Sequence, residues 1–103
     1  MLRFFAFFKS RSLEPFSSYQ KGLIEKETLF YIQEYEGELE EVNVVENYFT
    51  LIFLINMKMD IKKMLAQIVN ECNQYGDFVD PNFVITNVKI FSEEDIQKEL
   101  QKN

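Results

Sequence analysis

Acidic side chains are the most abundant residues in this sequence that could take part in catalysis. The chain of 103 residues contains 17 Asp and Glu residues and no His. The absence of His removes the commonest general base and the usual nitrogen ligand of zinc. Two neighbouring carboxylates could still perform acid–base chemistry of the kind used in sugar hydrolysis. The best-placed pair, Glu93 and Asp95, lies where the first turn of a helix is expected, and helix capping explains it.

The sequence gives equally little support for a metal site, a catalytic cysteine or a phosphate-binding loop. Asp77, Asp80 and Asn82 lie close together but lack the spacing of a calcium-binding loop, so a turn explains them better. The single cysteine, Cys72, cannot form an internal disulfide and is expected on the buried face of a helix. The three glycines are too far apart to form a phosphate-binding loop. The sequence therefore predicts no catalytic residue, no cofactor site and no metal site, and a protein that is not an enzyme.

A series of glutamates is the first unusual feature. Glu occupies alternate positions from 34 to 40 and then position 41, and no Lys or Arg occurs between residues 27 and 56. Alternate residues of a strand share one face, where like charges repel one another. Such a row could be a solvated face, a protected sheet edge, or a surface that binds a basic protein. The partner-binding residues predicted on the last interpretation are Glu34, Glu36, Glu38, Glu40 and Glu41.

A cluster of phenylalanines near the N-terminus is the second unusual feature of the sequence. Residues 1–12 carry Arg3, Lys9 and Arg11 with no acid. Four phenylalanines in this segment cannot all enter one core face of a strand, so either both faces are covered or some rings contact a partner. We therefore expect a Phe-rich basic strand or arm whose possible oligomer or docking contacts are Phe4, Phe5, Phe7 and Phe8. Its uncharged run is too short for a signal peptide or a membrane span.

The elements that would position these residues follow from local patterns. Residues 1–10 favour a strand, and residues 12–22, with Pro15 and Gly22, favour one or two helical turns or an ordered loop. Three further strands are predicted at 27–35, 38–46 and 48–57, with a turn at Glu36–Gly37. The 48–57 segment is apolar at nearly every position, which predicts a strand in the middle of the sheet with both faces covered.

The C-terminal half has clearer boundaries. Asp60 can cap a helix whose apolar face is Ile61, Met64, Leu65, Ile68 and Cys72, with Gly76 as the stop, so a helix is predicted over 61–75. A strand is predicted over 83–91, with Val84, Val88 and Ile90 on one side. Ser92 and Asp95 form a capping box for a short helix over about 93–102, which docks through Ile96 and Leu100.

Together these elements predict a single α+β domain over residues 1–103. Its sheet is antiparallel, possibly mixed, with four or five strands, and the 61–75 helix packs on one face. The net charge is −6 and the pI is about 4.6, which disfavours direct nucleic-acid binding.

The functional prediction follows from this acidity and from the missing catalytic motifs. The sequence predicts a small cytoplasmic, non-catalytic inhibitor of a basic protein, of the toxin-immunity or nucleic-acid-mimic type. The alternative is a structural subunit that docks through its Phe-rich N-terminus on a larger complex or on a second copy, as in a homodimer. No transmembrane segment is expected.

Overall fold

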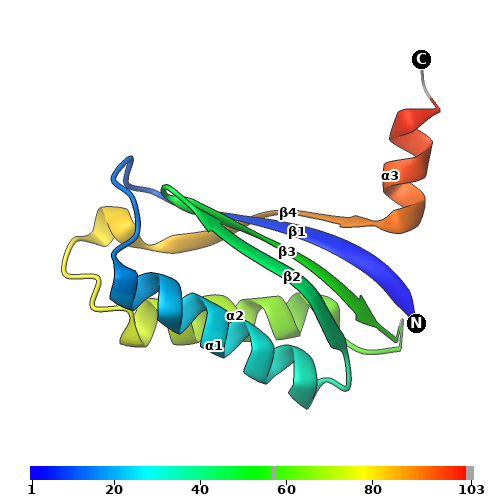
Figure 1. The fold of residues 1–103 in the computed structure, drawn as a ribbon, viewed down its shortest axis with the longest axis horizontal. Helices are drawn as coiled ribbons and strands as arrows, with labels where there is room; N and C mark the ends of the chain where they lie inside the picture. The colour runs from blue at the N-terminus through cyan, green and yellow to red at the C-terminus, as the bar shows by residue number, and fades with distance from the viewer. Residues whose placement is uncertain (57, 102–103) are drawn as a thin grey trace.

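The computed structural model describes residues 1–56 and 58–101, and they form one α+β domain (Figure 1). Four strands and three α-helices lie within these residues. In chain order they are β1 (Leu2–Ser10), α1 (Ser18–Glu34), β2 (Glu38–Val45), β3 (Tyr48–Ile55), α2 (Ile61–Tyr75), a 3-10 turn (Pro81–Phe83), β4 (Ile85–Ser92) and α3 (Glu93–Leu100).

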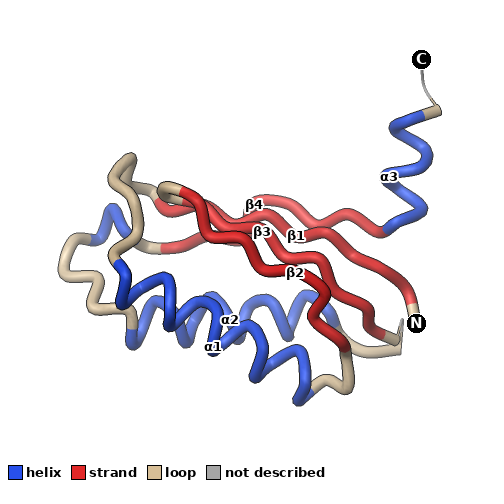
Figure 2. Tube along the Cα trace, viewed as in Figure 1, coloured by secondary structure: helices blue, strands red, loops and turns tan. Residues whose placement is uncertain are grey.

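The strands form one four-stranded sheet with the order β2-β3-β1-β4, and all neighbours are antiparallel. Helices α1 and α2 lie side by side and cover the same face of this sheet (Figures 1 and 2). The opposite face carries neither of these helices, and α3 projects from the body at the end of β4. This β-α-β-β-α-β order with a four-stranded antiparallel sheet is the ferredoxin-like arrangement.

The core lies between the sheet and the two long helices. Every second residue of β1 and β3 points into it, so the buried positions have one parity in each strand. From the sheet the fully buried core side chains include Ala6, Phe8, Phe49, Leu51, Phe53 and Ile55. From the helices they include Ile24, Ile32, Met64, Leu65, Ile68 and Cys72.

Helix α1 was not predicted, because residues 27–35 were expected to be a strand and residues 12–22 a short helix or loop. The structure has one helix over Ser18–Glu34. Its N-terminus is fixed by a capping box, in which the Ser17 hydroxyl accepts from the backbone N–H of Gln20 and the Gln20 side chain accepts from the backbone N–H of Ser17. Gly22 lies inside the helix, not after its end.

The other predicted strands, at 1–10, 38–46, 48–57 and 83–91, are confirmed with two corrections. Strand β3 is central, as expected, but only one of its faces is buried, and its even-numbered residues remain partly exposed. Strand β4 begins at Ile85, and its register against β1 shifts around Val88. This bulge leaves Val88 51% exposed while Ile90 packs against the core, so the two do not share one buried side.

Helix α2 matches its predicted bounds, and the side chain of Asp60 caps it by accepting from the backbone N–H of Lys63. Its apolar face is buried as predicted except for Ile61, which is only partly buried. The predicted extensions of β3 to Met57 and of α3 to residue 102 reach positions outside the described residues. Within the described part of the chain, no helix has the length and apolar character needed to cross a membrane.

Candidate functional site

The sheet face opposite α1 and α2, here called the open face, brings aromatic and basic side chains together. Strand pairing sets its rows. Tyr48 of β3 lies opposite Lys9 of β1, and Thr86 of β4 lies on the other side of Lys9. In the next rows Phe7 lies between Thr50 and Lys89, and Phe5 lies between Ile52 and Phe91. The open face therefore has an aromatic centre on β1 with cations beside it.

Ring contacts hold this centre together. The rings of Phe7 and Tyr48 stack at 5.3 Å between centroids, and those of Phe5 and Phe91 meet at 6.2 Å with a tilt of 40°. The ammonium group of Lys89 lies 4.9 Å from the centroid of the Phe91 ring, within cation–π range. These aromatic residues are partly exposed, so they combine mutual packing with access from solvent.

Charge is divided across the sheet. Strands β1 and β4 carry Arg3, Lys9 and Lys89 and no acid, while β2 carries three glutamates and no base. In the sheet order, β2 lies at one edge and β4 at the other. The acidic total of the chain therefore conceals a basic half of the sheet.

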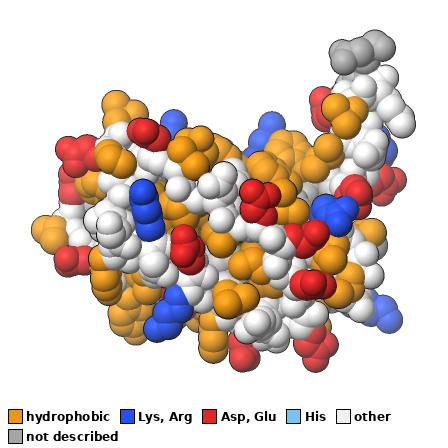
Figure 3. All heavy atoms as spheres, viewed as in Figure 1, with side chains coloured by type: hydrophobic (Ala, Val, Ile, Leu, Met, Phe, Trp, Pro, Cys, Tyr) orange, Lys and Arg blue, Asp and Glu red, His pale blue; other side chains and the backbone are white. Residues whose placement is uncertain are grey.

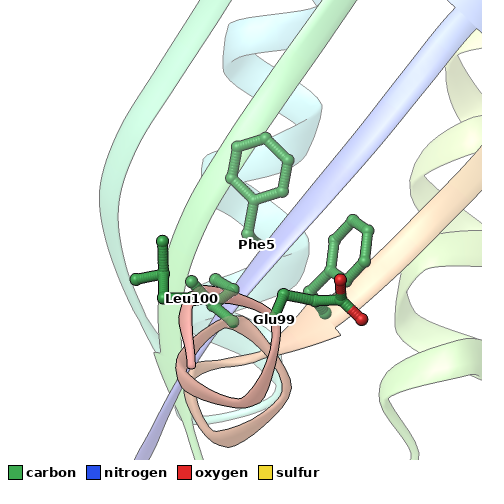
Figure 4. A pocket seen from close by; sticks show the side chains of 5 residues that line it. Phe5, Glu99 and Leu100 are labelled. Carbon is green, nitrogen blue, oxygen red and sulfur yellow. The ribbon is translucent and has the colours of Figure 1, made fainter. Parts of the chain in front are cut away.

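Helix α3 forms a wall at one end of the open face. An apolar hollow of about 380 Å³ lies between it and the sheet, lined by Phe5, Phe91, Ile96, Glu99 and Leu100 (Figure 4). A second hollow of about 210 Å³ shares Phe5 and Ile96 and adds Arg3 and Ile52 among its walls. In the space-filling view α3 stands out from the body, with hydrophobic side chains gathered at its foot (Figure 3).

Arg3 ties the start of α3 to the far edge of the sheet. Its Nε donates to Glu40 Oε1 of β2 at 2.6 Å, and its Nη1 donates to Glu93 Oε1 of α3 at 3.3 Å. The hydrogen bond from Arg3 holds the pKa of the Glu40 carboxyl below its ordinary value, and the same bond raises the pKa of Arg3. All three side chains are substantially exposed, so these ion pairs orient α3 more than they stabilise the fold.

Tyr48 is the tyrosine that the open face presents. The Tyr19 hydroxyl donates to the backbone oxygen of Tyr75 at 3.0 Å, at the end of α2. The Tyr35 hydroxyl donates to Gln67 Oε1 at 2.8 Å between the two long helices. Burial raises the pKa of Tyr31, with a further contribution from a hydrogen bond with Glu71. These four tyrosines belong to the helical layer or its ends.

The structure separates the predicted glutamate row. Glu34 is the last residue of α1 and Glu36 lies in the following turn with φ of 60°, so only Glu38, Glu40 and Glu41 are in a strand. The strand register shifts between Leu39 and Glu41, which places Glu40 at an irregularity. The expected hairpin with one continuous acidic face was therefore wrong in geometry, and binding of a basic protein at these residues stays a prediction.

The predicted phenylalanine cluster is split between the two faces of β1. Phe8 is fully buried and Phe4 packs against the core, whereas Phe5 and Phe7 belong to the open face. The cluster is thus part of a central strand and not a free arm. Whether Phe5 and Phe7 contact a second copy stays a prediction.

Asp95 and Cys72, which were considered for catalysis, have structural roles. Asp95 accepts from the backbone N–H of Ser92 in the α3 capping box, and this bonding to Ser92 lowers the pKa of Asp95. Burial raises the pKa of the Cys72 thiol to about 12, with nearby Glu27 and Glu71 adding to the effect. Among residues 1–56 and 58–101, no group of three His, Cys, Asp or Glu side chains is arranged to hold a metal ion.

Sequence reasoning missed the residues that β3 and β4 contribute to the open face. Tyr48, Lys89 and Phe91 were read as ordinary strand positions. The available signal was that basic and aromatic residues share the odd positions of both 3–9 and 89–91. Their convergence depends on β1 lying between β3 and β4, which local patterns do not reveal.

Comparison with known proteins gives matches at the level of structure only. No protein-family model and no curated protein matches the sequence. A crystal structure of a candidate transposase from Deinococcus radiodurans R1 superposes with a TM-score of 0.69 and 9% identity, covering 99% of this chain and 86% of that one. A REP-associated tyrosine transposase bound to a REP hairpin gives a TM-score of 0.65 and 11% identity, covering 95% of this chain and 61% of that one.

These matches overturn the predicted function class. One of the two structures named above is described as a candidate transposase and the other as a tyrosine transposase, and transposases are enzymes. The prediction of a non-catalytic inhibitor or immunity protein, with a docking subunit as its alternative, was therefore wrong, as was the prediction that the chain is not an enzyme. At these identities the comparison establishes the fold of this chain as one that transposases use.

Proposed function

We propose that this chain acts on DNA as a transposase-type enzyme, with a tyrosine hydroxyl as the group that attacks a DNA phosphodiester. The observation that carries the proposal is the likeness to a candidate transposase over 99% of this chain. The second similar structure is a tyrosine transposase bound to a hairpin. A single-stranded DNA that contains a hairpin is accordingly the substrate class to test first.

Tyr48 is our candidate for the attacking residue because of its place on the open face. It lies opposite Lys9 in the strand register and stacks on Phe7, which in turn lies beside Lys89. Lysine side chains at this position can neutralise a DNA phosphate, and an aromatic ring beside them can stack on a base. The open face thus offers a nucleophile, positive charge and stacking surface in adjacent rows.

The proposed step transfers the phosphoryl group of the DNA from a deoxyribose oxygen to the tyrosine oxygen. The phenolic oxygen attacks the phosphorus and forms a phosphotyrosine bond, while the bond from phosphorus to one deoxyribose oxygen breaks. The phenolic proton passes to water, and the leaving oxygen takes a proton from water. Negative charge builds on the phosphoryl oxygens in the transition state, where Lys9 and Lys89 supply positive charge.

The proposal departs from the expectation that an acidic chain does not bind nucleic acid. That expectation rested on the net charge of −6 for the whole chain. Strands β1 and β4, which contribute Lys9 and Lys89, carry only basic charges. A cytoplasmic location remains a prediction and would give access to DNA.

The test is capture of a covalent protein–DNA adduct. The full chain is incubated with Mg²⁺ and single-stranded DNA oligonucleotides that contain a hairpin and carry a label at either end. Adducts are resolved under denaturing conditions and mapped by mass spectrometry. We expect an adduct on Tyr48 that is lost in Tyr48→Phe, which keeps the ring stack.

Matched controls are Tyr19→Phe and Tyr75→Phe, since both residues are well exposed on the helical layer, where α1 begins and α2 ends. Their adduct yield should equal that of the unaltered chain. An adduct that maps to Tyr19 or Tyr75 would reject Tyr48 but keep the function. Absence of both binding and adduct over a panel of hairpins would overturn the proposed function.

A further inference from the structure

The hollow between α3 and the sheet is an apolar site at one end of the open face. It measures about 380 Å³, within the range of small-molecule sites in proteins. Phe5 and Phe91 come from the two paired strands β1 and β4, and Ile96 and Leu100 come from α3 (Figure 4). Leu100 is 65% exposed and Ile96 is 37% exposed, so the α3 side of the hollow lacks full cover in the folded chain.

We propose that this hollow binds one unstacked nucleobase of a DNA single strand, held between the Phe5–Phe91 pair and α3. The proposal rests on the proposed function and names the site that positions its substrate. It adds a base-binding site separate from Tyr48, two rows further along the open face.

The first argument is the chemistry of the hollow. A nucleobase is flat and needs an aromatic or apolar surface against its ring face, which Phe5 and Phe91 supply at 6.2 Å from each other. Lys89 lies over the Phe91 ring, so a cation stands beside this surface where a neighbouring phosphate can reach it. Four-stranded sheets that bind single-stranded nucleic acid use exposed aromatic residues in the same way.

The second argument is spacing. Phe5 and Phe7 are alternate residues of β1, so they lie about 6.6–6.8 Å apart along the strand. This is roughly twice the 3.4 Å that separates successive bases along one strand of a duplex. Two neighbouring bases can therefore occupy both ring pairs only when they are unstacked from each other, which a single strand permits and a duplex does not.

The third argument is charge. A DNA backbone that follows β1 and β4 meets Lys9 and Lys89 with opposite charge. These two strands form the half of the sheet away from β2 and its glutamates.

The experiment combines a protein change with a change in the DNA. Binding of the full chain to labelled 12-nucleotide single strands is measured by fluorescence anisotropy, with a single abasic position moved along the strand. The protein variant is Phe91→Leu, which keeps an apolar wall but removes the ring. At one position, loss of the base should weaken binding by the unaltered chain by roughly 5- to 150-fold.

In Phe91→Leu the same abasic position should change affinity by less than about 2-fold, because the base and the ring belong to one interaction. Val88→Ala is the matched control: Val88 is exposed on the same strand but does not line the hollow, so the abasic effect should persist there. A 2-aminopurine base at that position should lose fluorescence on binding to the unaltered chain and keep it with Phe91→Leu. Melting temperatures of both variants verify the fold.

If an abasic position lowers the affinity equally for the unaltered chain and for Phe91→Leu, wherever it is placed, this inference is overturned. DNA binding by both proteins would still leave the proposed function in place. Binding of single-stranded RNA with refusal of DNA would overturn the proposed function and the DNA assignment of the hollow. Absence of binding to any single strand would overturn the inference. Covalent adduct formation, measured separately, then decides the fate of the proposed function.

Discussion

The rings of Phe8 and Phe49 stack at 4.6 Å between centroids and within 8° of parallel, one residue from the end of the β1–β3 pairing. Both side chains are fully buried. We expect Phe8→Ala to lower the free energy of unfolding by about 3–5 kcal/mol. Phe7→Ala is the matched control on the other face of β1, where the ring is partly exposed and the loss should be smaller. Urea denaturation of both variants tests this, and equal losses would contradict the assigned faces.

Thr28 offers a site for stabilisation. Its side chain is fully buried in α1, and its Oγ1 has no hydrogen-bond partner among the described residues. Valine has nearly the same shape without the buried hydroxyl, so Thr28→Val should raise the free energy of unfolding by about 1 kcal/mol. Thermal unfolding should show an increase of roughly 4–8 °C for such a change. Thr28→Ser, which keeps the hydroxyl and loses the methyl, should lower the melting temperature instead.

The Cys72 thiol should resist alkylation in the folded protein. It is fully buried, and its pKa is raised from 9.0 to about 12. Little thiolate therefore forms at pH 8, and the reagent has no access to it. Because the folded-state pKa is the higher one, this contribution to stability is present below pH 9 and is lost as the pH rises towards 12. Labelling with iodoacetamide across a urea titration should follow unfolding, and rapid labelling without urea would contradict the placement.

The Arg3–Glu40 pair should give a small acid dependence to stability. The pKa of Glu40 is held below its ordinary value of 4.5, chiefly by the hydrogen bond from Arg3. Its contribution is therefore present above pH 4.5 and is lost as the pH falls through the lower folded-state pKa. Glu40→Gln should flatten this part of the stability curve between pH 2 and 5. Glu14→Gln in the loop before α1 is the charge-matched control, and identical curves for both variants would reject the effect.

Reversing charge on the acidic edge should strengthen DNA binding if DNA follows the open face. Glu38 and Glu41 lie opposite Leu54 and Ile52 of β3, which places them on the open face beside the aromatic rows. The double change of both residues to Lys should raise affinity for single-stranded DNA and make it more dependent on salt. Changing Glu25 and Glu34 of α1 to Lys alters the net charge equally and should have less effect. Equal gains from both pairs would mean that only net charge matters.

The parts of the fold that could be predicted from sequence are those whose local signals agree with their packing. Helix α2 has an apolar stripe, an Asp cap and a Gly stop, and its predicted bounds match the structure. Strand β1 was recognised from its phenylalanines. The α+β class followed from these elements, and the sheet, predicted with four or five strands, has four.

Helix α1 was missed because its inward and outward faces do not differ in polarity. Two of its four buried positions are Gln20 and Thr28, while Leu29 and Phe30 on its outer side are about half exposed. An apolar stripe could not be read from such a pattern. The capping box at Ser17 and Gln20 was the available signal, and the β-favouring residues from 28 to 32 outweighed it in the prediction.

The candidate site could be predicted only within single strands. The alternation of Phe5 and Phe7 with buried neighbours follows from the two-residue repeat of a strand. Their contacts with Tyr48 and Phe91 depend on register between segments more than 40 residues apart, and on a bulge at Val88. The predicted glutamate row does not form one face, because its residues extend over a helix end, a turn and a strand irregularity.

The interior position of β1 also determines when the sheet can assemble during synthesis. Phe4 pairs with Phe53 on one side and with Ser92 on the other, so β1 must wait for two segments that are synthesised much later. Such long separations between partners slow folding and leave an apolar strand unpaired meanwhile. Production at low temperature, or together with a chaperone that shields Phe-rich segments, should therefore raise the soluble yield more than changes to the surface of the finished domain.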